Sequence, residues 1–214
     1  AIEETVRSAG ANGRIAPILM VGFNRRFAPH VVRIKALLET AHDPKSFVMT
    51  VNAGAVSPGH WTRDPDAGGG RIIGEACHFI DLLRFLAGSA IVEHQVAAAR
   101  TADACVTVSL RFSDGSTGAL HYLSNGHRSF PKERLEVFCG GRVLQLDNFR
   151  TLRGFGWPGF NTMRLWRQDK GQEACVGAFV AAVREGKVSP IPFKELLEIT
   201  RTTFEIAQAL DGQS

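Results

Sequence analysis

The first half of the chain alternates between continuous apolar runs and segments with helical spacing. Residues 17–24 read PILMVGFN and residues 46–54 read SFVMTVNAG. Such runs are typical of strands buried on both faces. Residues 1–9 are a short amphipathic stretch, and residues 28–41 repeat apolar positions at helical spacing behind Pro29. The pattern predicts helix, strand, helix and strand in that order.

The next segment predicts a loop that leads into a buried helix. Residues 55–70 are rich in glycine, proline and aspartate. Residues 71–86 are apolar nearly all round when they are placed on a helical wheel, and Gly88 follows as a stop signal. A helix without a polar face is expected to be buried on most sides.

After residue 90 the pattern changes to strands joined by hairpin turns. Strand-like segments occupy residues 91–101, 104–124, 133–157 and 161–168. Turn residues separate them at Asp114-Gly115, at Gly140-Gly141 and in the glycine and proline run at 156–159. Apolar residues alternate within these segments, which predicts a sheet with one face on a core. The clearest alternating positions are Val106, Val108, Leu110, Phe112, Leu135 and Val137.

Two helices are predicted to close the chain. The first covers residues 173–185, and the second covers residues 193–210 after Pro192. Helices that alternate with strands and then give way to a run of strands indicate an α+β fold on a large antiparallel or mixed sheet. The residues expected to point inward from the first of these helices are Val176, Phe179, Val180 and Val183.

Composition and charge narrow the class of protein. The 214 residues are 44% hydrophobic and 21% charged, which predicts a packed core rather than disorder. The net charge of +4 is too small for the dense basic stripe of a nucleic-acid-binding protein. Residues 125–134 and 148–154 are basic, but they lack the interleaved aromatic residues of a binding platform. We therefore do not expect nucleic acid as a partner. We do not expect a membrane as a partner either, because no run of apolar residues approaches the ~18 that a membrane span needs.

The cysteines and the first residues bear on location. Cys77, Cys105, Cys139 and Cys175 are far apart and form no C-x-x-C pair, which argues against a zinc site. Buried free thiols in apolar runs are typical of a reducing, cytoplasmic compartment. The opening residues AIEETVRSAGANG do not resemble a signal peptide. They predict the end of a helix that was cut from a longer chain.

The glycine run at residues 68–74 only superficially resembles a dinucleotide-binding loop. Such a loop follows a buried strand and opens a helix within a βαβ unit. The residues that precede it here, HWTRDPDA, cannot form a buried strand. We interpret the glycines as flexible backbone that a ligand can approach closely, next to a helix N-terminus that favours an anionic group.

The predicted helix at residues 71–86 carries Glu75, His78 and Asp81 among its apolar residues. Burying such groups without partners costs several kcal/mol. One interpretation is a core histidine held by Asp81, which lies three residues away on the same face. The other is a functional imidazole, flanked by carboxylates and suited to proton transfer. The spacing alone leaves both open.

Several motifs together resemble the Gfo/Idh/MocA family of NAD(P)-dependent oxidoreductases. They are LMVGFNRRFAPH at residues 19–30, HWTRDPDAGGGRIIGEACHFIDLLRFLAG at 60–88 and PKERLEVFCGGRVLQLDNFRTL at 131–152. The branch that acts on sugars and nucleotide sugars is the most similar. The resemblance implies a C-terminal α/β domain, like that of glyceraldehyde-3-phosphate dehydrogenase. Its open, mixed but mostly antiparallel sheet has helices on one face.

The resemblance also implies how the chain is divided and what it binds. Residues 1–24 are expected to be the end of an N-terminal Rossmann domain, and residues 25–214 the domain for substrate binding and oligomerisation. NAD or NADP, with the catalytic lysine of a Glu-Lys-Pro motif, would belong to the missing Rossmann domain. The present chain alone is then expected to bind no cofactor and to be inactive. Homo-oligomers would form through the sheet.

His78 matches the catalytic histidine of the family, and Asp81 matches its later aspartate. The family pattern places another aspartate four residues before the histidine, where this chain has Gly74 and then Glu75. Because of this departure, the sequence does not decide whether the usual carboxylate–histidine proton relay is intact. The departure also supports the alternative of a non-catalytic binding or scaffolding relative with the same fold. The residues expected to contact a sugar or nucleotide-sugar substrate are Arg25, Arg26, His60, Trp61, Glu75, Asp81, Arg128 and Lys132.

Overall fold

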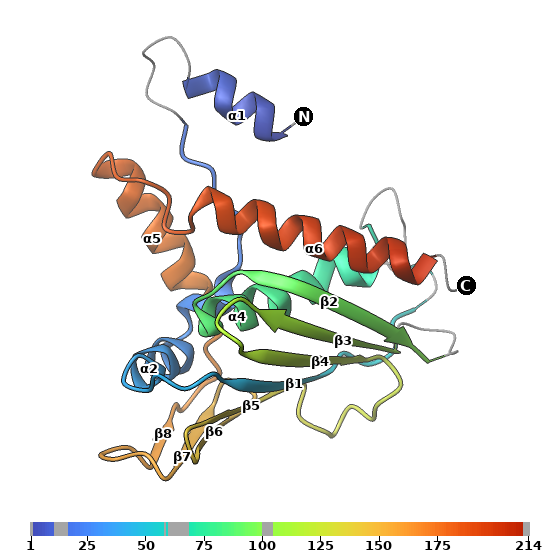
Figure 1. Ribbon diagram of the computed structural model, residues 1–214, viewed down its shortest axis with the longest axis vertical. Coiled ribbons are helices and arrows are strands. Elements are labelled where there is room, and N and C mark those ends of the chain that lie inside the picture. The colour runs from blue at the N-terminus through green and yellow to red at the C-terminus, as the bar shows by residue number, and fades with distance from the viewer. Residues whose placement is uncertain (1, 11–16, 58, 60–68, 100–104, 212–214) are drawn as a thin grey trace.

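The strand-like second half of the chain forms one open sheet, into which a single strand from the first half is inserted. The computed structural model describes residues 2–10, 17–57, 59, 69–99 and 105–211. Its eight strands have the order β2-β3-β4-β1-β5-β6-β7-β8 (Figure 1). All neighbours are antiparallel except β1 and β4, which run parallel. The predicted mixed, mostly antiparallel sheet is confirmed. The strands are β1 (Ser46–Asn52), β2 (Ile91–Ala98), β3 (Cys105–Phe112), β4 (Thr117–Leu123), β5 (Glu133–Cys139), β6 (Arg142–Asp147), β7 (Thr151–Phe155) and β8 (Thr162–Arg164).

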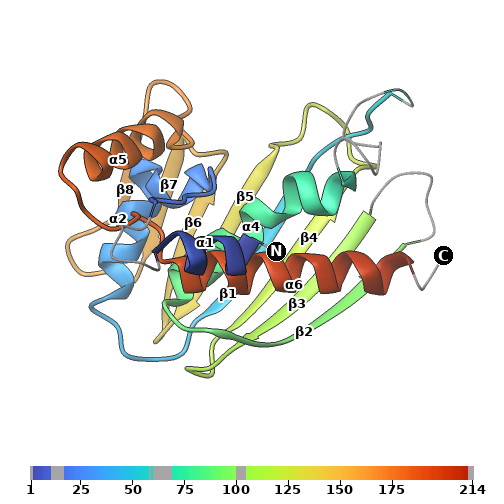
Figure 2. The ribbon, with the colours of Figure 1, turned by 90° about the horizontal axis from the view of Figure 1, so that it is seen from above.

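The helices cover one face of this sheet. Figure 2 shows α2 and α5 over the β6–β8 half, α4 over the middle and α6 over β2 and β3. The helix predicted behind Pro29 is present, with that proline at its start. The elements are α1 (Ile2–Gly10), the 3₁₀ turn η1 (Asn24–Phe27), α2 (Pro29–Leu38), the π-helical turn η3 (Ile72–Ala76), α4 (Cys77–Ala87), α5 (Gln172–Arg184) and α6 (Phe193–Asp211).

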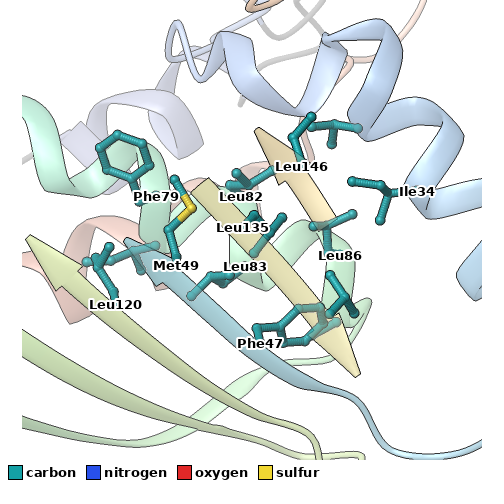
Figure 3. Packing of buried hydrophobic residues seen from close by; sticks show 14 of the residues in the cluster. Ile34, Phe47, Met49, Phe79, Leu82, Leu83, Leu86, Leu120, Leu135 and Leu146 are labelled. Carbon is teal, nitrogen blue, oxygen red and sulfur yellow. The ribbon is translucent and has the colours of Figure 1, made fainter. Parts of the chain in front are cut away.

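The core lies between the helices and the covered face of the sheet. The six alternating positions predicted from β3 and β5 are all buried. Leu82, Leu83 and Leu86 of α4 are also buried, as the all-round apolar pattern of this helix predicts. Figure 3 shows these leucines in one cluster with Ile34 of α2, Phe47 and Met49 of β1 and Leu120 of β4. This packing fixes α4 against the sheet, and with it the residues at the start of that helix.

The strand predicted at residues 17–24 is wrong. The segment has no regular secondary structure up to Phe23 and then enters η1. A buried parallel strand needs neighbours that accept its backbone hydrogen bonds, and no strand in the described part of the chain lies beside this segment. The carbonyl of Leu19 accepts a hydrogen bond from the Ser189 hydroxyl at 2.8 Å instead. A continuous apolar run therefore did not suffice to predict a strand.

The inward face predicted for α5 is also wrong. Val176, Val180 and Val183 are exposed, Phe179 is half-buried, and the residues that α5 buries are Cys175 and Ala182. The helix packs against η1, and its three valines face away from the core. The periodicity predicted the helix correctly but not the side that packs.

Gly171, just before α5, allows the backbone there to lie close to η1, because it has no side chain. Its φ is +81°, and a Cβ atom there would lie 2.5 Å from the amide nitrogen of Ala28 and the carbonyl oxygen of Asn24. We expect Gly171→Ala to lower the free energy of unfolding by more than about 1 kcal/mol in urea denaturation. Gly177→Ala is the matched control, since Gly177 is helical with open space around it. That variant should gain about 0.5–1 kcal/mol. Equal effects at both positions would contradict this account.

Candidate functional site

His78 lies in the first turn of α4, immediately after the π-helical turn η3. In η3 the amide of Cys77 bonds the carbonyl of Ile72, five residues back. Such π-turns are frequent at functional sites because they change the direction in which neighbouring side chains point. Gly69 and Gly70 precede the turn with positive φ, so the chain enters it through backbone that favours glycine.

The His78 imidazole is half-buried in surroundings that disfavour its charge. Its Nδ1 is buried and has no hydrogen-bond partner among the described residues. The ring stands edge-on to Phe23, with 5.7 Å between ring centroids. Burial and, after it, the charge of the Arg25 guanidinium lower the pKa of His78 to about 4, against the opposite effects of Glu133 and Glu75. The ring is therefore neutral at physiological pH and able to accept a proton.

Glu75 does not bond to His78, although its charge acts on the imidazole. Its carboxylate accepts a 2.7 Å hydrogen bond from the hydroxyl of Tyr122, a fully buried residue of β4. Its other oxygen lies 3.5 Å from Nε of Arg71. Burial and the Glu75 carboxylate together raise the pKa of Tyr122 above its ordinary range. Glu75 thus joins η3 to the sheet beside the histidine, from a direction that the helical spacing did not predict.

Arg25 reaches the same region from η1. Its guanidinium donates two 3.0 Å hydrogen bonds to the carboxylate of Glu133 at the start of β5. The guanidinium also lies 4.3 Å above the centre of the Phe79 ring. Lys170 contacts the same carboxylate at 2.6 Å. Burial opposes ionisation of Glu133, but the two cations outweigh it, and the pKa of this carboxyl lies below its ordinary value.

Arg26 and Asp81 form a separate buried ion pair on the other side of η1. Nε of Arg26 donates to Asp81 at 3.1 Å, and Nη2 donates to the other carboxylate oxygen. Nη1 bonds Glu195 of α6 at 3.0 Å. Asp81 has no exposed surface, and burial raises its pKa to about 6 against the effect of Arg26. Both residues therefore hold η1, α4 and α6 together, and their geometry supports positioning rather than contact with a substrate. Asp81 is bonded to Arg26 rather than to the histidine, so the interpretation of His78 as a core histidine held by Asp81 is not supported.

The remaining predicted contacts lie in loops. His60 and Trp61 are outside the described residues. Arg128 and Lys132 are exposed in the loop 124–132 between β4 and β5. Asn52 at the end of β1 ties this loop down, because its side-chain amide donates to the carbonyls of His127 and Phe130 at 2.9 and 3.3 Å. The loop begins where β4 ends and leads into β5 at Glu133, so it lies at the same end of the sheet as Arg25 and Lys170.

Sequence reasoning missed Glu133, Lys170 and Tyr122. Each reaches the site from an element far from His78 in the chain, so helical spacing could not reveal it. One signal was present: Glu133 is a carboxylate at an inward position of β5, in phase with Leu135 and Val137. A charge in that phase needs a partner. Lys170 lies in a loop, where its sequence context gave no indication.

Residues 33–143, just over half of the chain, match the family described as GFO/IDH/MocA C-terminal domain. The chain belongs to this family. The fold, with its open mixed sheet and its helices on one face, is that of the GFO/IDH/MocA C-terminal domain. No curated protein matches the sequence.

Solved structures of similar fold include several oxidoreductases. Aldose-aldose oxidoreductase from Caulobacter crescentus, complexed with glycerol, has a TM-score of 0.75 and 16% identity over 97% of this chain and 66% of that one. Levoglucosan dehydrogenase, in complex with NADH and levoglucosan, has a TM-score of 0.75 and 21% identity over 92% and 65%. A dehydrogenase from Chromobacterium violaceum has a TM-score of 0.71 and 21% identity over 96% and 64%. The GFO/IDH/MocA domain thus spans about two thirds of the length of these chains.

Two further properties concern the described residues only. None of their helices is long and apolar enough to cross a membrane. Among them, no strand–glycine loop–helix unit of the dinucleotide-binding type is present, because the glycines at 69 and 70 follow no strand.

Proposed function

We propose that the chain is the substrate domain of an oxidoreductase that moves a hydride between NAD or NADP and a hydroxyl or ketone of a sugar or nucleotide sugar. The observation that carries the proposal is the neutral, half-buried His78, which follows a π-turn and on which the charges of Arg25, Glu133 and Glu75 act. Family membership and the fold shared with sugar-binding and NADH-binding dehydrogenases support it.

In this proposal His78 is the catalytic residue. The nicotinamide would accept the hydride from the carbinol carbon. His78 would accept the hydroxyl proton, which leaves a ketone. Because Nδ1 is buried, the nitrogen that faces a substrate is Nε2. The reverse reaction returns the proton from the imidazolium to the new alcohol. Arg128, Lys132 and the residues His60 and Trp61 remain proposed substrate contacts.

The surfaces of the domain support the proposed partners. Val183 of α5 lines a concavity of about 860 Å³ together with Pro17, Ile18 and Phe193. In this proposal the cofactor domain packs against this region, and residues 1–24 form the C-terminal end of that domain. The uncovered face of the sheet exposes Phe138 and Phe155, and we assign it to a second copy of the chain. The four free cysteines support a reducing, cytoplasmic compartment.

A panel assay tests this function. The full-length protein, with its cofactor domain, is incubated with NAD or NADP and with aldoses, anhydro sugars and nucleotide sugars. We expect absorbance of the reduced nicotinamide to appear with one class of sugar, together with the matching keto product by mass spectrometry. Binding of a sugar without any turnover would instead support the non-catalytic relative, for which the glycine at position 74 is the favouring observation.

A further inference from the structure

The loop that connects β8 to α5 presents the most exposed large apolar side chain in the described part of the chain (Figure 1). The indole of Trp166 is 90% exposed, whereas Trp157 is buried. A scattered exposed valine is ordinary on a protein surface, but an indole offers a large flat apolar area that a ligand can cover. The groups around Trp166 therefore indicate which ligand fits it.

The loop is held in place by the turn between β6 and β7. The amide of Leu165 donates to the carbonyl of Arg150 at 2.9 Å, and Nη2 of Arg150 donates to the carbonyl of Trp166 at 3.1 Å. The side-chain amide of Gln168 donates to both oxygens of Asn148, at 2.7 and 3.0 Å. The indole is thus presented by a backbone that is fixed before a ligand arrives, which lowers the entropic cost of binding.

Two guanidinium groups lie beside the indole. Trp166 and Arg167 line an open hollow of about 470 Å³. Arg150 reaches the main chain of Trp166 from the adjacent turn. Both arginines are exposed, and neither forms an ion pair with a described residue. Guanidinium groups bind phosphate oxygens in pairs and also stack on flat rings. The combination favours a ligand that is both aromatic and anionic.

Two carboxylates line the same hollow, and they distinguish between anionic ligands. Asp169 accepts a 2.7 Å hydrogen bond from the amide of Gly171, so its carboxylate belongs to the end of the loop. Glu173 is exposed in the first turn of α5. A carboxylate repels a simple phosphate, but it is suited to accept hydrogen bonds from ribose hydroxyls, as an acidic residue does in dinucleotide-binding domains. The mixture of charges therefore favours a nucleotide over an inorganic polyphosphate.

We propose that Trp166, Arg150, Arg167 and Glu173 form a binding site for a nucleoside diphosphate group, the nucleotide half of a nucleotide-sugar substrate. The base stacks on the indole, the ribose hydroxyls donate to Glu173, and the guanidinium groups bind the phosphates. This inference rests on the proposed function and narrows its substrate from sugars in general to nucleotide sugars.

The same loop joins the nucleotide site to the candidate active site through direct contacts. Lys170, at the end of the loop, donates to Glu133 at 2.6 Å. Glu133 accepts two hydrogen bonds from Arg25, whose guanidinium lies 4.3 Å above the ring of Phe79, the residue that follows His78. The diphosphate of a nucleotide sugar separates its base from its sugar. A base on the indole therefore leaves the sugar free to extend along the loop toward the imidazole.

The first test is ligand binding to this chain by titration calorimetry. The probes are the diphosphates of uridine, guanosine and adenosine, with pyrophosphate and the unphosphorylated nucleosides for comparison. At least one nucleoside diphosphate should bind, and about 10-fold more tightly than pyrophosphate, because only the nucleotide stacks on the indole. Trp166→Ala should weaken this binding by about 5- to 100-fold, the range for loss of one base stack. Arg167→Gln should weaken binding of the nucleoside diphosphate but not of its nucleoside.

The control is Phe204→Ala, which removes another exposed aromatic ring, on α6, and should leave binding unchanged. Circular dichroism confirms that each variant is folded before it is titrated. The inference is overturned if no nucleoside diphosphate binds, if pyrophosphate binds as tightly, or if Trp166→Ala binds like the Phe204 variant. An equal effect of Arg167→Gln on nucleotide and nucleoside also overturns it.

The second test separates substrate from cofactor, because NAD also contains a nucleoside diphosphate group. In the full-length protein, Trp166→Ala should lower kcat/KM for the nucleotide sugar by about 5- to 100-fold and leave the KM for NAD or NADP unchanged. A rise in the cofactor KM instead would assign the site to the cofactor and overturn the inference. Turnover of a free sugar by a protein that binds no nucleoside diphosphate refutes the nucleotide site alone. Binding that depends on Trp166, without turnover of any sugar in the panel, refutes the proposed function alone.

Discussion

Replacing His78 by alanine is expected to reduce hydride transfer in the full-length protein by about 10²- to 10⁴-fold, the range for loss of a general base. The imidazole is the proposed proton acceptor. None of its contacts supports the fold, since Nδ1 has no partner in the described structure and the ring only stands edge-on to Phe23. The rate is measured by nicotinamide absorbance in single turnovers, and cofactor affinity by fluorescence. Cofactor affinity should not change.

His42→Ala provides the matched control, because His42 is exposed in the loop after α2. That variant should turn over normally. If His78→Ala reacts as fast as the His42 variant, another group accepts the proton and the role assigned to His78 is wrong. The loss of activity at low pH provides a second test of the role of His78. A base whose pKa is lowered to about 4 stays deprotonated as the pH falls through 6.5, so activity should be lost only near 4.

Replacing Asp81 by alanine should lower the free energy of unfolding by about 3–5 kcal/mol, as is typical when one partner of a buried ion pair is removed. The variant leaves the Arg26 guanidinium, which is 4% exposed, with Glu195 as its remaining partner. The pair joins η1, α4 and α6, so its loss should loosen all three. The measurement is the urea midpoint at constant slope.

The double variant Arg26→Met/Asp81→Leu separates charge from packing. Apolar residues of similar volume leave no buried charge, so the double variant should recover most of the lost stability. Arg111→Ala removes one partner of an exposed pair on the uncovered face of the sheet and should leave the midpoint where it was. A double variant as unstable as Asp81→Ala would show that the cost lies in shape rather than in charge.

Local patterns predicted the elements that their own residues determine. Alternation in β3 and β5 gave the buried face of the sheet, and the all-round apolar pattern gave the buried α4. The apolar run at residues 17–24 was wrongly predicted to be a strand. Such a run indicates that a segment can be buried, but not that a neighbouring strand is present to pair with it. The inward face of α5 was missed for a similar reason, since the side that the fold buries carries the small residues Cys175 and Ala182 rather than the valines.

The spacing of the polar residues on one helix left both a core histidine and a functional one open, and the family resemblance singled out His78 as the centre of the candidate site. Glu133 and Lys170 were not predicted. The charges that act on His78 come from η1, β5 and η3, and Glu133 in turn is bonded to Arg25 and Lys170, which only the folded chain brings together. Helical spacing also placed Asp81 beside the histidine, whereas the fold turned it toward Arg26. Pairings over such separations are decided by tertiary packing, which a helical wheel does not describe.

The parallel pairing of β1 with β4 has a consequence for the order in which the chain folds. Ser46 of β1 is paired with Thr117 on one side and with Phe138 on the other. During synthesis β1 leaves the ribosome long before either partner exists, while β3 and β4 are joined by a short turn and pair at once. Closing the longer loops costs entropy that adjacent hairpins avoid. The centre of the sheet therefore cannot form before β5 has been made, although β1 is the first strand of the sheet to be synthesised.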